Sequence, residues 1–398
     1  MQMGEEFTRA DSPSRGPGEM TRRQWLAGIV GFVAAGPRLG PTRSAWAAPA
    51  DDRTRAMTTL RALIHHHTRD PRDAWAIVHG VRAMGAEWSV HDGTRAVDYV
   101  LATLVKMQAV GQGRHLYVPL EIEMHLNSFL ETFLSVGVGW QQPARAENRV
   151  YSFRDLFDHA RMLFSFSDPG PDTPSGAHHR ESDWFAWSLI AFPFGIPPSK
   201  DGWQNAFGQE IRVARITAMG LQMLEEATAP LARAMERGEL LVEKVGVHTL
   251  TSGGAHLISG VISAVQHGYT QGDAAKRLAR QLDILVYRLI TELQLISRFY
   301  QQDQRHPIAN VYELDTRLYF LGHALRNLTV ARRGGVFRPT LAQQRQIQEA
   351  ESALYGVVDR LRGFDLEKIR KLDERLFQRL VGDASYAYEA LRLAFPLA

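Results

Sequence analysis

Apolar residues recur at three- and four-residue spacing along most of this 398-residue chain. That spacing places them on one face of an α-helix, whereas a half-buried strand needs strict alternation, which no long segment sustains. Glycine, proline and aspartate separate the periodic segments, as at Asp70-Pro71 and Gly334-Gly335. The sequence therefore predicts an all-α protein, with helices at residues 53–67, 73–85, 94–109, 121–136, 153–164, 183–192, 205–228, 249–268, 274–300, 312–332, 340–362 and 383–395.

The predicted helices are of two kinds. Six are rich in small residues and apolar on most faces, and a helix of that composition has to be buried on most faces. Longer charged helices, such as 274–300 and 340–362, lie between them and are expected on the outside. The six apolar segments are AWAIVHGVRAMG (74–85), MHLNSFLETFLSVGVG (124–139), DWFAWSLIAF (183–192), TLTSGGAHLISGVISAV (249–265), LYFLGHALRNL (318–328) and YAYEALRLAF (386–395).

This alternation predicts helical hairpins arranged as an inner and an outer ring. The pattern resembles the (α/α) toroid shared by several polysaccharide-degrading enzymes and by terpenoid cyclases. The resemblance is one of architecture and covers about residues 55–396. The paired aspartates that bind diphosphate are absent, as is the cysteine and histidine zinc set of lanthionine-forming toroids. An α-helical repeat superhelix or an irregular bundle would produce the same alternation.

A short segment near the N-terminus indicates export. TRRQWL (21–26) precedes an apolar run of about 11 residues and then Ala45-Trp46-Ala47. It resembles a twin-arginine signal, whose pattern is Ser/Thr-Arg-Arg-x-Phe-Leu, with Trp25 in the aromatic position. The run is shorter than the roughly 20 residues that span a membrane, and the small residues before Ala48 are typical of a signal-peptidase site.

The resemblance implies that residues 1–47 are a cleaved signal and that residues 21–47 engage the twin-arginine export machinery. The mature chain would then be in the periplasm or beyond. We expect its residues, 48–398, to form one domain. Proteins on that route fold before export. The chain has no cysteine, which agrees with folding in the reducing cytoplasm and excludes cysteine nucleophiles and thiolate metal sites. No later apolar stretch reaches 18 residues, so we expect no stable membrane anchor.

Charge argues against a nucleic-acid partner. Residues 1–47 hold six of the 46 basic and four of the 43 acidic residues, so the predicted mature chain has a formal net charge of +1. It contains no run of five basic residues. A near-neutral chain without a basic patch lacks the electrostatic footprint of nucleic-acid binding.

In a ring of hairpins, polar residues at the ends of the inner helices converge on one mouth. Glu121 and His125 would share a helix face at four-residue spacing, where they can hold zinc, iron or manganese, or act as a base and its orienting carboxylate. His248 precedes Gly253-Gly254 at the start of an apolar helix. Glycines there cost about 1 kcal/mol each relative to alanine and indicate a close contact with a backbone or ligand.

Two more candidates lie at the end of the longest irregular stretch, 166–182, whose length is typical of functional loops. His178 lies near its end, and Asp183 directly follows it. The candidate catalytic residues are therefore Glu121, His125, His178, Asp183 and His248, and a divalent metal would be held by Glu121, His125 and His248. His79, His256 and His323 are second choices, because a lone histidine on an apolar helix is more often structural. His65-His66-His67 is interpreted as a solvated helix end, with adventitious metal binding as the alternative.

No motif in the chain specifies a reaction: HExxH, GxSxG, a P-loop and GxGxxG after a strand are all absent. The residue types at the predicted mouth suit an exported enzyme acting on a small polar molecule or a polysaccharide, either as a lyase or hydrolase or with a His/Glu-bound divalent metal. The alternative is a non-catalytic periplasmic scaffold or ligand-binding protein. That alternative predicts scattered histidines and an exposed apolar patch larger than a few hundred Å².

Overall fold

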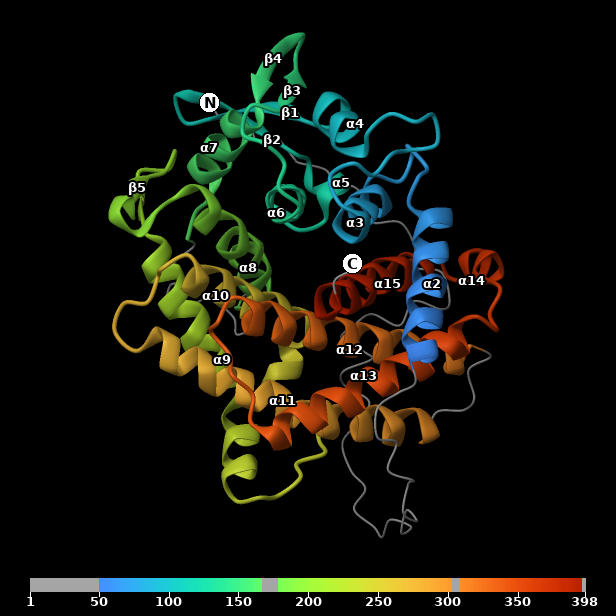
Figure 1. The fold of residues 1–398 in the computed structure, drawn as a ribbon. Helices are drawn as coiled ribbons and strands as arrows, with labels where there is room; N and C mark the ends of the chain where they lie inside the picture. The colour runs from blue at the N-terminus through green and yellow to red at the C-terminus, as the bar shows by residue number, and fades with distance from the viewer. Residues whose placement is uncertain (1–49, 167–177, 303–307, 396–398) are drawn as a thin grey trace, which may run out of the picture. The chain divides into compact units, whose positions relative to one another are not determined.

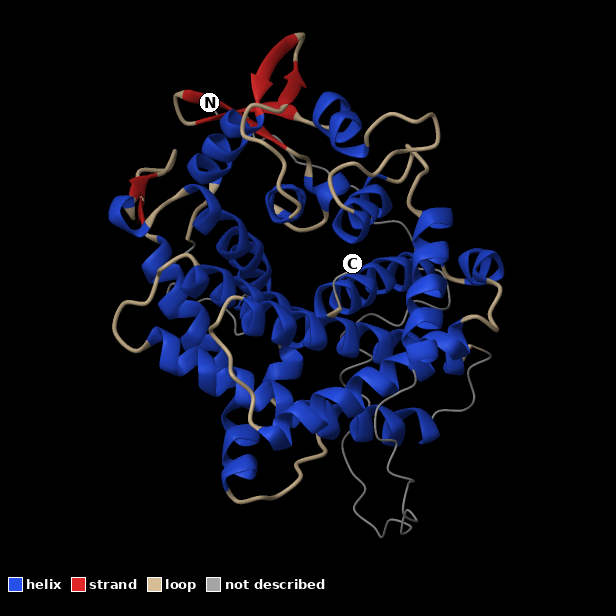
Figure 2. Cartoon of the chain, viewed as in Figure 1, coloured by secondary structure: helices blue, strands red, loops and turns tan. Residues whose placement is uncertain are grey.

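The periodic segments of the sequence fold as helices in a computed structural model, which describes residues 50–166, 178–302 and 308–395. Within these residues there are fourteen α-helices and three small antiparallel hairpins (Figures 1 and 2). The all-α prediction is thereby confirmed. None of the described helices is long and apolar enough to cross a membrane.

The six apolar segments form six helices that pack in a closed order. Each contacts the next along the chain, and the last contacts the first again. In Figure 1 they surround a common centre. They are α3 (Ala74–Met84), α6 (Ser128–Ser135), α8 (His178–Gly195), α10 (Ala255–Gln266), α12 (Ala309–Arg333) and α15 (Glu374–Ala394). We refer to them as the inner helices.

Four amphipathic helices cover the inner ones. These outer helices are α2 (Ala50–His67), α9 (Val213–Glu236), α11 (Ala274–Gln302) and α13 (Leu341–Leu361). α9 packs against α11, α11 against α13, and α13 against α2. A capping box starts one of them, since the Thr340 side chain accepts a hydrogen bond from the Gln343 backbone N–H.

Hairpins and short helices complete the remaining side, where α4 packs against β3 and α7 against β2. The β3–β4 hairpin turns at Glu147-Asn148, both with positive φ (48° and 63°), as a two-residue hairpin turn requires. The elements are α4 (Ala96–Thr103), α5 (Leu120–Glu123), α7 (Phe153–Leu163), β1 (Lys106–Val110), β2 (Gly113–Tyr117), β3 (Pro143–Ala146), β4 (Arg149–Ser152), β5 (Trp203–Gln204) and β6 (Glu210–Ile211). The short helix α14 (Leu366–Leu372) instead packs against α15.

Glycines set how closely two pairs of inner helices approach. A Cβ on Gly322 of α12 would lie 3.0 Å from the Ala387 backbone nitrogen of α15, and one on Gly260 of α10 would lie 3.0 Å from the Ala186 carbonyl oxygen of α8. Both distances are shorter than ordinary van der Waals contact. The small residues of the apolar segments therefore permit close backbone packing.

Four predicted helices are shorter or broken. The segment 205–228 is helical only from Val213, because Glu210–Ile211 pairs as a strand with Trp203–Gln204. The segment 94–109 ends as a helix at Thr103, because Lys106–Val110 pairs as a strand with Gly113–Tyr117. The segment 121–136 is interrupted: α5 ends at Glu123, and Met124 and Asn127 have positive φ. The segment 249–268 begins with two 3₁₀ turns, η2 (Gly246–Thr249) and η3 (Thr251–Gly254), before α10 starts.

Candidate functional site

A polar cavity lies among the inner helices, and all six contribute to its wall. The wall side chains leave no free volume for a water molecule, so a ligand could enter only if they moved. Buried charged groups inside an apolar bundle have to be paired to be tolerated, so the partners of each determine what the site can do. The polar and aromatic wall residues are Arg82 from α3, Glu131 from α6, Trp187 from α8, His256 and Ser259 from α10, His323, Arg326 and Asn327 from α12, and Tyr386 from α15.

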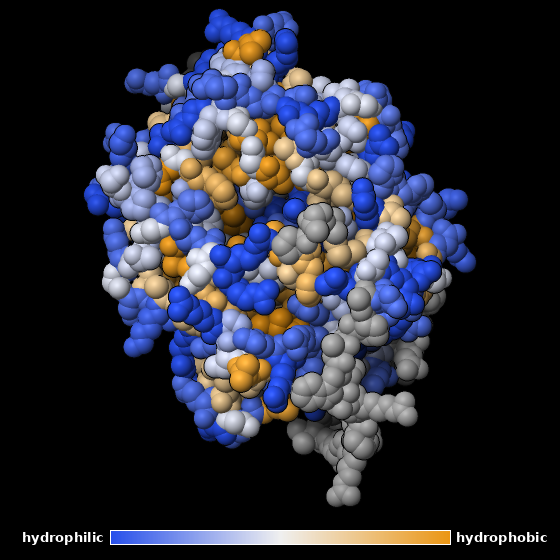
Figure 3. Space-filling view, in the orientation of Figure 1, coloured by the Kyte–Doolittle hydropathy of each residue, from blue (hydrophilic) through white to orange (hydrophobic). Residues whose placement is uncertain are grey.

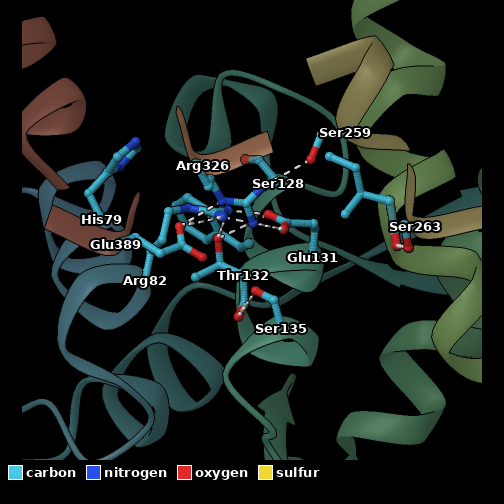
Figure 4. A network of polar contacts seen from close by, with 12 residues as sticks. His79, Arg82, Ser128, Glu131, Thr132, Ser135, Ser259, Ser263, Arg326 and Glu389 are labelled. Carbon is cyan, nitrogen blue, oxygen red and sulfur yellow. Dashed lines mark hydrogen bonds and ion pairs between the residues drawn. The ribbon is translucent and has the colours of Figure 1, made fainter. Parts of the chain in front are cut away.

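Two arginines and two glutamates form a buried ionic network at this cavity (Figure 4). Arg326 donates from Nε to Glu389 Oε2 (2.8 Å) and from Nη1 to Ser259 Oγ (2.9 Å). Arg82 is paired with Glu131, and its Nη1 lies 3.8 Å from Glu389 Oε2. Although burial opposes ionisation of Glu389, Arg326 and Arg82 lower its pKa. The network therefore holds two positive and two negative charges and is balanced.

Histidines and aromatic rings stack in a row beside this network. The His323 ring is centred 3.9 Å from that of Tyr386, and the His256 ring 4.1 Å from that of Trp187. His256 and His323 meet edge to face at 4.9 Å. At the two ends of the row, His125 stacks on Trp187 at 5.7 Å and His79 lies 6.0 Å from Tyr386. The row thus joins α3, the α5–α6 connection, α8, α10, α12 and α15.

Three histidines of this row, His79, His256 and His323, are neutral at physiological pH. Burial, reinforced by neighbouring arginines and histidines, lowers the pKa of His256 and of His323 well below 6.5. Burial also lowers the pKa of His79 to about 3, even though its Nδ1 lies 2.8 Å from the Trp75 carbonyl oxygen. A neutral imidazole can accept a proton on one nitrogen while the other donates, as a general base does.

Among the described residues, two polar atoms of the cavity wall have no hydrogen-bond partner. They are Trp187 Nε1 and Tyr386 Oη, and both residues are only 4% exposed. Burial raises the pKa of Tyr386, so its hydroxyl remains protonated and available as a donor. Buried donors without partners are rare in native proteins, and each needs an explanation such as a bound water or a ligand.

A carboxyl pair adjoins the row on its other side. Asp383 Oδ1 lies 3.7 Å from His323 Nε2, and Asp315 Oδ2 accepts from Arg379 Nε at 3.0 Å. Burial and the nearby Asp315 carboxylate raise the pKa of Asp383 well above its ordinary value, and burial raises that of Asp315 to about 6. Burial thus favours the protonated form of Asp383, which lies next to a neutral histidine.

Of the five candidate residues predicted from the sequence, His125 lies at this centre, together with the second choices His79, His256 and His323. Glu121 is exposed, and the helix that was to align it with His125 ends at Glu123. The expected four-residue pairing is therefore not formed. His178 and Asp183 lie in the first turns of α8, but their side chains are outside the described residues.

His248 belongs to a different network. Its Nε2 lies 2.8 Å from Glu292 Oε1, and Arg288 donates to the same oxygen at 2.7 Å. Burial opposes ionisation of Glu292, yet Arg288 and His248 lower its pKa to about 2. Arg288 also donates to the carbonyl oxygen of Gly253, so this network supports the turn that the glycines form.

That turn is where the two glycines are needed. Ser252, Gly253 and Gly254 have φ of 56°, 55° and 76°, so three successive residues lie in the left-handed region. Gly253 and Gly254 also line a second, more apolar pocket with about 30 Å³ of free volume, which shares His323 and Asn327 with the polar cavity. The close contact with a backbone or ligand expected at these glycines is not seen: the atoms nearest to a Cβ there would be side-chain atoms, such as Arg288 at Gly253 and Leu224 at Gly254, and the positive φ values account for the glycines.

The predicted metal triad is not assembled. Among the described residues, ligand atoms of three histidine or acidic side chains come within 4.8 Å of one another at His66, His67 and Glu367. Glu121, His125 and His248 do not form such a group in that part of the chain. A cluster of histidine and glutamate is present, but at the end of α2.

Prediction from the sequence missed the charged residues of the centre. Arg82, Glu131, Arg326 and Glu389 are isolated charges inside four of the six apolar segments. An unpaired charge cannot be buried in an apolar helix, so two basic and two acidic residues in such positions indicate mutual pairing. That signal was available in the sequence.

No family model, curated protein or solved structure matches the chain.

Proposed function

We propose that this protein is an exported enzyme that performs general acid–base chemistry on a small polar substrate, or on the end of a carbohydrate chain, in the central cavity. The observation that carries the proposal is the pair of unpartnered buried donors, Trp187 Nε1 and Tyr386 Oη, on one cavity wall. A buried donor without a partner costs about 1–3 kcal/mol. An acceptor atom of a ligand would remove that cost.

Charge balance favours an uncharged, hydroxyl-rich ligand. Arg82 and Arg326 are both paired with carboxylates, so neither offers an uncompensated cation to an acidic substrate. Sugar hydroxyls can instead accept from Trp187 and Tyr386 and donate to a neutral imidazole nitrogen. A lyase acting on a uronate would need its substrate carboxylate neutralised, and this network favours that reaction less.

The acid and base would come from the histidine row. His256 and His323 are neutral and line the cavity, so either can accept a proton from a substrate hydroxyl or from water. Tyr386 would donate a hydrogen bond to the oxygen on which charge develops. Asp383, 3.7 Å from His323, would hold its proton more firmly than the histidine, because burial raises the pKa of Asp383 and lowers that of His323.

The toroid-like arrangement and the export route belong to the same proposal. The closed packing order of the six inner helices supports the toroid, and TRRQWL supports twin-arginine export to the periplasm or beyond. The scaffold alternative predicts a broad apolar patch. Most exposed large apolar side chains of the described residues lie on separate elements, for example Val150, Leu341 and Leu372, although Leu120 and Met124 lie together at α5 and Figure 3 shows apolar residues gathered near the centre of one face.

The test is a ligand and activity screen with matched variants. The purified protein is incubated with neutral and uronate-containing oligosaccharides while melting temperature and product formation are followed. Trp187→Phe and Tyr386→Phe each remove one donor and keep the ring. Tyr269→Phe, which removes a buried hydroxyl outside the cavity, is the control.

We expect a neutral oligosaccharide to raise the melting temperature and to be converted, with both effects reduced about tenfold or more in the two cavity variants. Export is tested separately, by Arg22→Lys/Arg23→Lys, which should retain the protein in the cytoplasm. Saturable binding without conversion would favour the ligand-binding alternative. Equal binding by all variants would place the ligand elsewhere and refute the proposal.

A further inference from the structure

The end of α2 and the start of α14 bring three metal-binding side chains together. His66 and His67 close α2, and Glu367 lies in the first turn of α14, 300 residues later in the sequence. One ligand atom from each lies within 4.8 Å of the other two. We propose that these residues form a Zn²⁺ site that fastens α2 to α14, independently of the activity proposed above.

The spacing suits one small ion. His67 Nδ1 and Glu367 Oε1 are 3.6 Å apart, and the rings of His66 and His67 are centred 4.5 Å apart. A tetrahedral zinc with ligands at about 2.0–2.2 Å separates two of them by roughly 3.3–3.6 Å. Small side-chain rotations therefore complete a three-ligand site, with water as the fourth ligand.

The donor set selects the metal class. Two imidazoles and one carboxylate suit zinc and neighbouring transition metals, whereas Mg²⁺ and Ca²⁺ prefer oxygen ligands alone. The local dipoles also agree, because a cation is favoured at the carboxyl end of α2 and the Glu367 carboxylate at the amino end of α14.

The three ligand side chains differ in burial, and this difference decides which of them can be replaced without disturbing the core. The His67 side chain is 9% exposed and packs edge to face on Phe377 of α15 at 5.1 Å, so its position is held by the core. Glu367 is half exposed and can be replaced without disturbing packing. His65 is the matched control, since its ring contacts Trp88 and its Nε2 lies 3.4 Å from Arg69 Nη1, so it has other partners.

The experiment is a zinc titration of the purified, untagged protein after chelator treatment, by calorimetry and by the shift in melting temperature. We expect about one Zn²⁺ per chain and a higher melting temperature in its presence. His66→Ala, His67→Ala and Glu367→Gln should each weaken binding about tenfold or more, while His65→Ala retains it.

Glu367→Gln decides the matter, because its effect requires the folded contact between α2 and α14. Unchanged zinc affinity in that variant would overturn the proposal. So would equal losses in His65→Ala and His66→Ala, since these would assign binding to the histidine tract alone. Absence of zinc binding by the parent protein would overturn it as well.

Discussion

Arg326 on α12 donates to Glu389 on α15 across 2.8 Å, and the two side chains are 8% and 9% exposed. Removing one partner of a buried pair leaves an uncompensated charge, which costs about 3–5 kcal/mol. We therefore expect Arg326→Leu to lower the free energy of unfolding by that amount in urea titrations. Arg326→Leu/Glu389→Leu should cost less than the sum of the single changes, because it removes both charges.

An exposed pair provides the control for this prediction. Arg362 and Asp359 are 3.3 Å apart with side chains 52% and 62% exposed. Exposed pairs of this kind contribute little, so Arg362→Leu should leave stability unchanged within error. A comparable loss in both variants would mean that the central network is hydrated like the surface.

A comparison of two buried tyrosines distinguishes a hydroxyl with a structural role from one that is available to a ligand. Tyr269 donates to the Ile196 carbonyl oxygen at 2.8 Å, whereas the Tyr386 hydroxyl has no hydrogen-bond partner among the described residues. Tyr269→Phe should cost about 1–2 kcal/mol of stability, whereas Tyr386→Phe should raise stability by up to about 1–3 kcal/mol in the absence of ligand, because it removes a buried unsatisfied donor. The measurement is the urea midpoint of each variant. Equal losses would show that a partner such as buried water satisfies Tyr386 and would weaken its assignment to ligand binding.

Replacing glycine by alanine should change the free energy of unfolding in opposite directions at two helix positions. Gly322→Ala would press a methyl group on the Ala387 backbone, while a Cβ at Gly356 of α13 meets nothing within 4 Å. Overpacking costs about 1–3 kcal/mol, and the helix propensity gained is about 1 kcal/mol. We expect Gly322→Ala to lose about 1–2 kcal/mol in unfolding experiments and Gly356→Ala to gain up to about 1 kcal/mol. A stabilised Gly322→Ala would show that α12 and α15 can move apart.

The sequence predicted those parts of the fold that depend on local composition and missed those that depend on tertiary contacts. The six inner helices were predictable because composition alone requires their burial. The β3–β4 hairpin was not, because Glu147-Asn148 lacks the glycine that usually marks such a turn. The break after Glu123 depends on Met124 and Asn127 in left-handed conformations, which only tertiary contacts impose.

For the site, the sequence supplied the residue types but not the place where they meet. Polar residues were sought at helix ends, yet His79 and His323 lie in the middle of α3 and α12 and face the centre. Which side chains meet there depends on six segments coming together from residues 74 to 394. Isolated charges in apolar segments, such as Arg82 and Glu131, were the better guide, because their pairing is enforced by burial.

Acid should destabilise the protein through its buried neutral histidines, and His79 allows this to be measured. Burial lowers its folded-state pKa to about 3, against an ordinary value of 6.5 for histidine. Above pH 6.5 both states are unprotonated, so the histidine has no effect. Between pH 6.5 and 3 the unfolded chain binds a proton that the folded protein excludes, and stability falls as pH falls, by up to about 1.4 kcal/mol per pH unit.

His79→Asn keeps a donor for the Trp75 carbonyl oxygen, with which His79 Nδ1 interacts, and removes the titration. We therefore expect the variant to lose less stability than the parent between pH 6.5 and 4.5, by about 2–3 kcal/mol, and to show the same pH dependence as the parent above pH 7. Urea unfolding at half-unit pH steps measures both ranges. Parallel curves across the acid range would mean that His79 takes up a proton in the folded protein, which would in turn require solvent to reach the end of the histidine row.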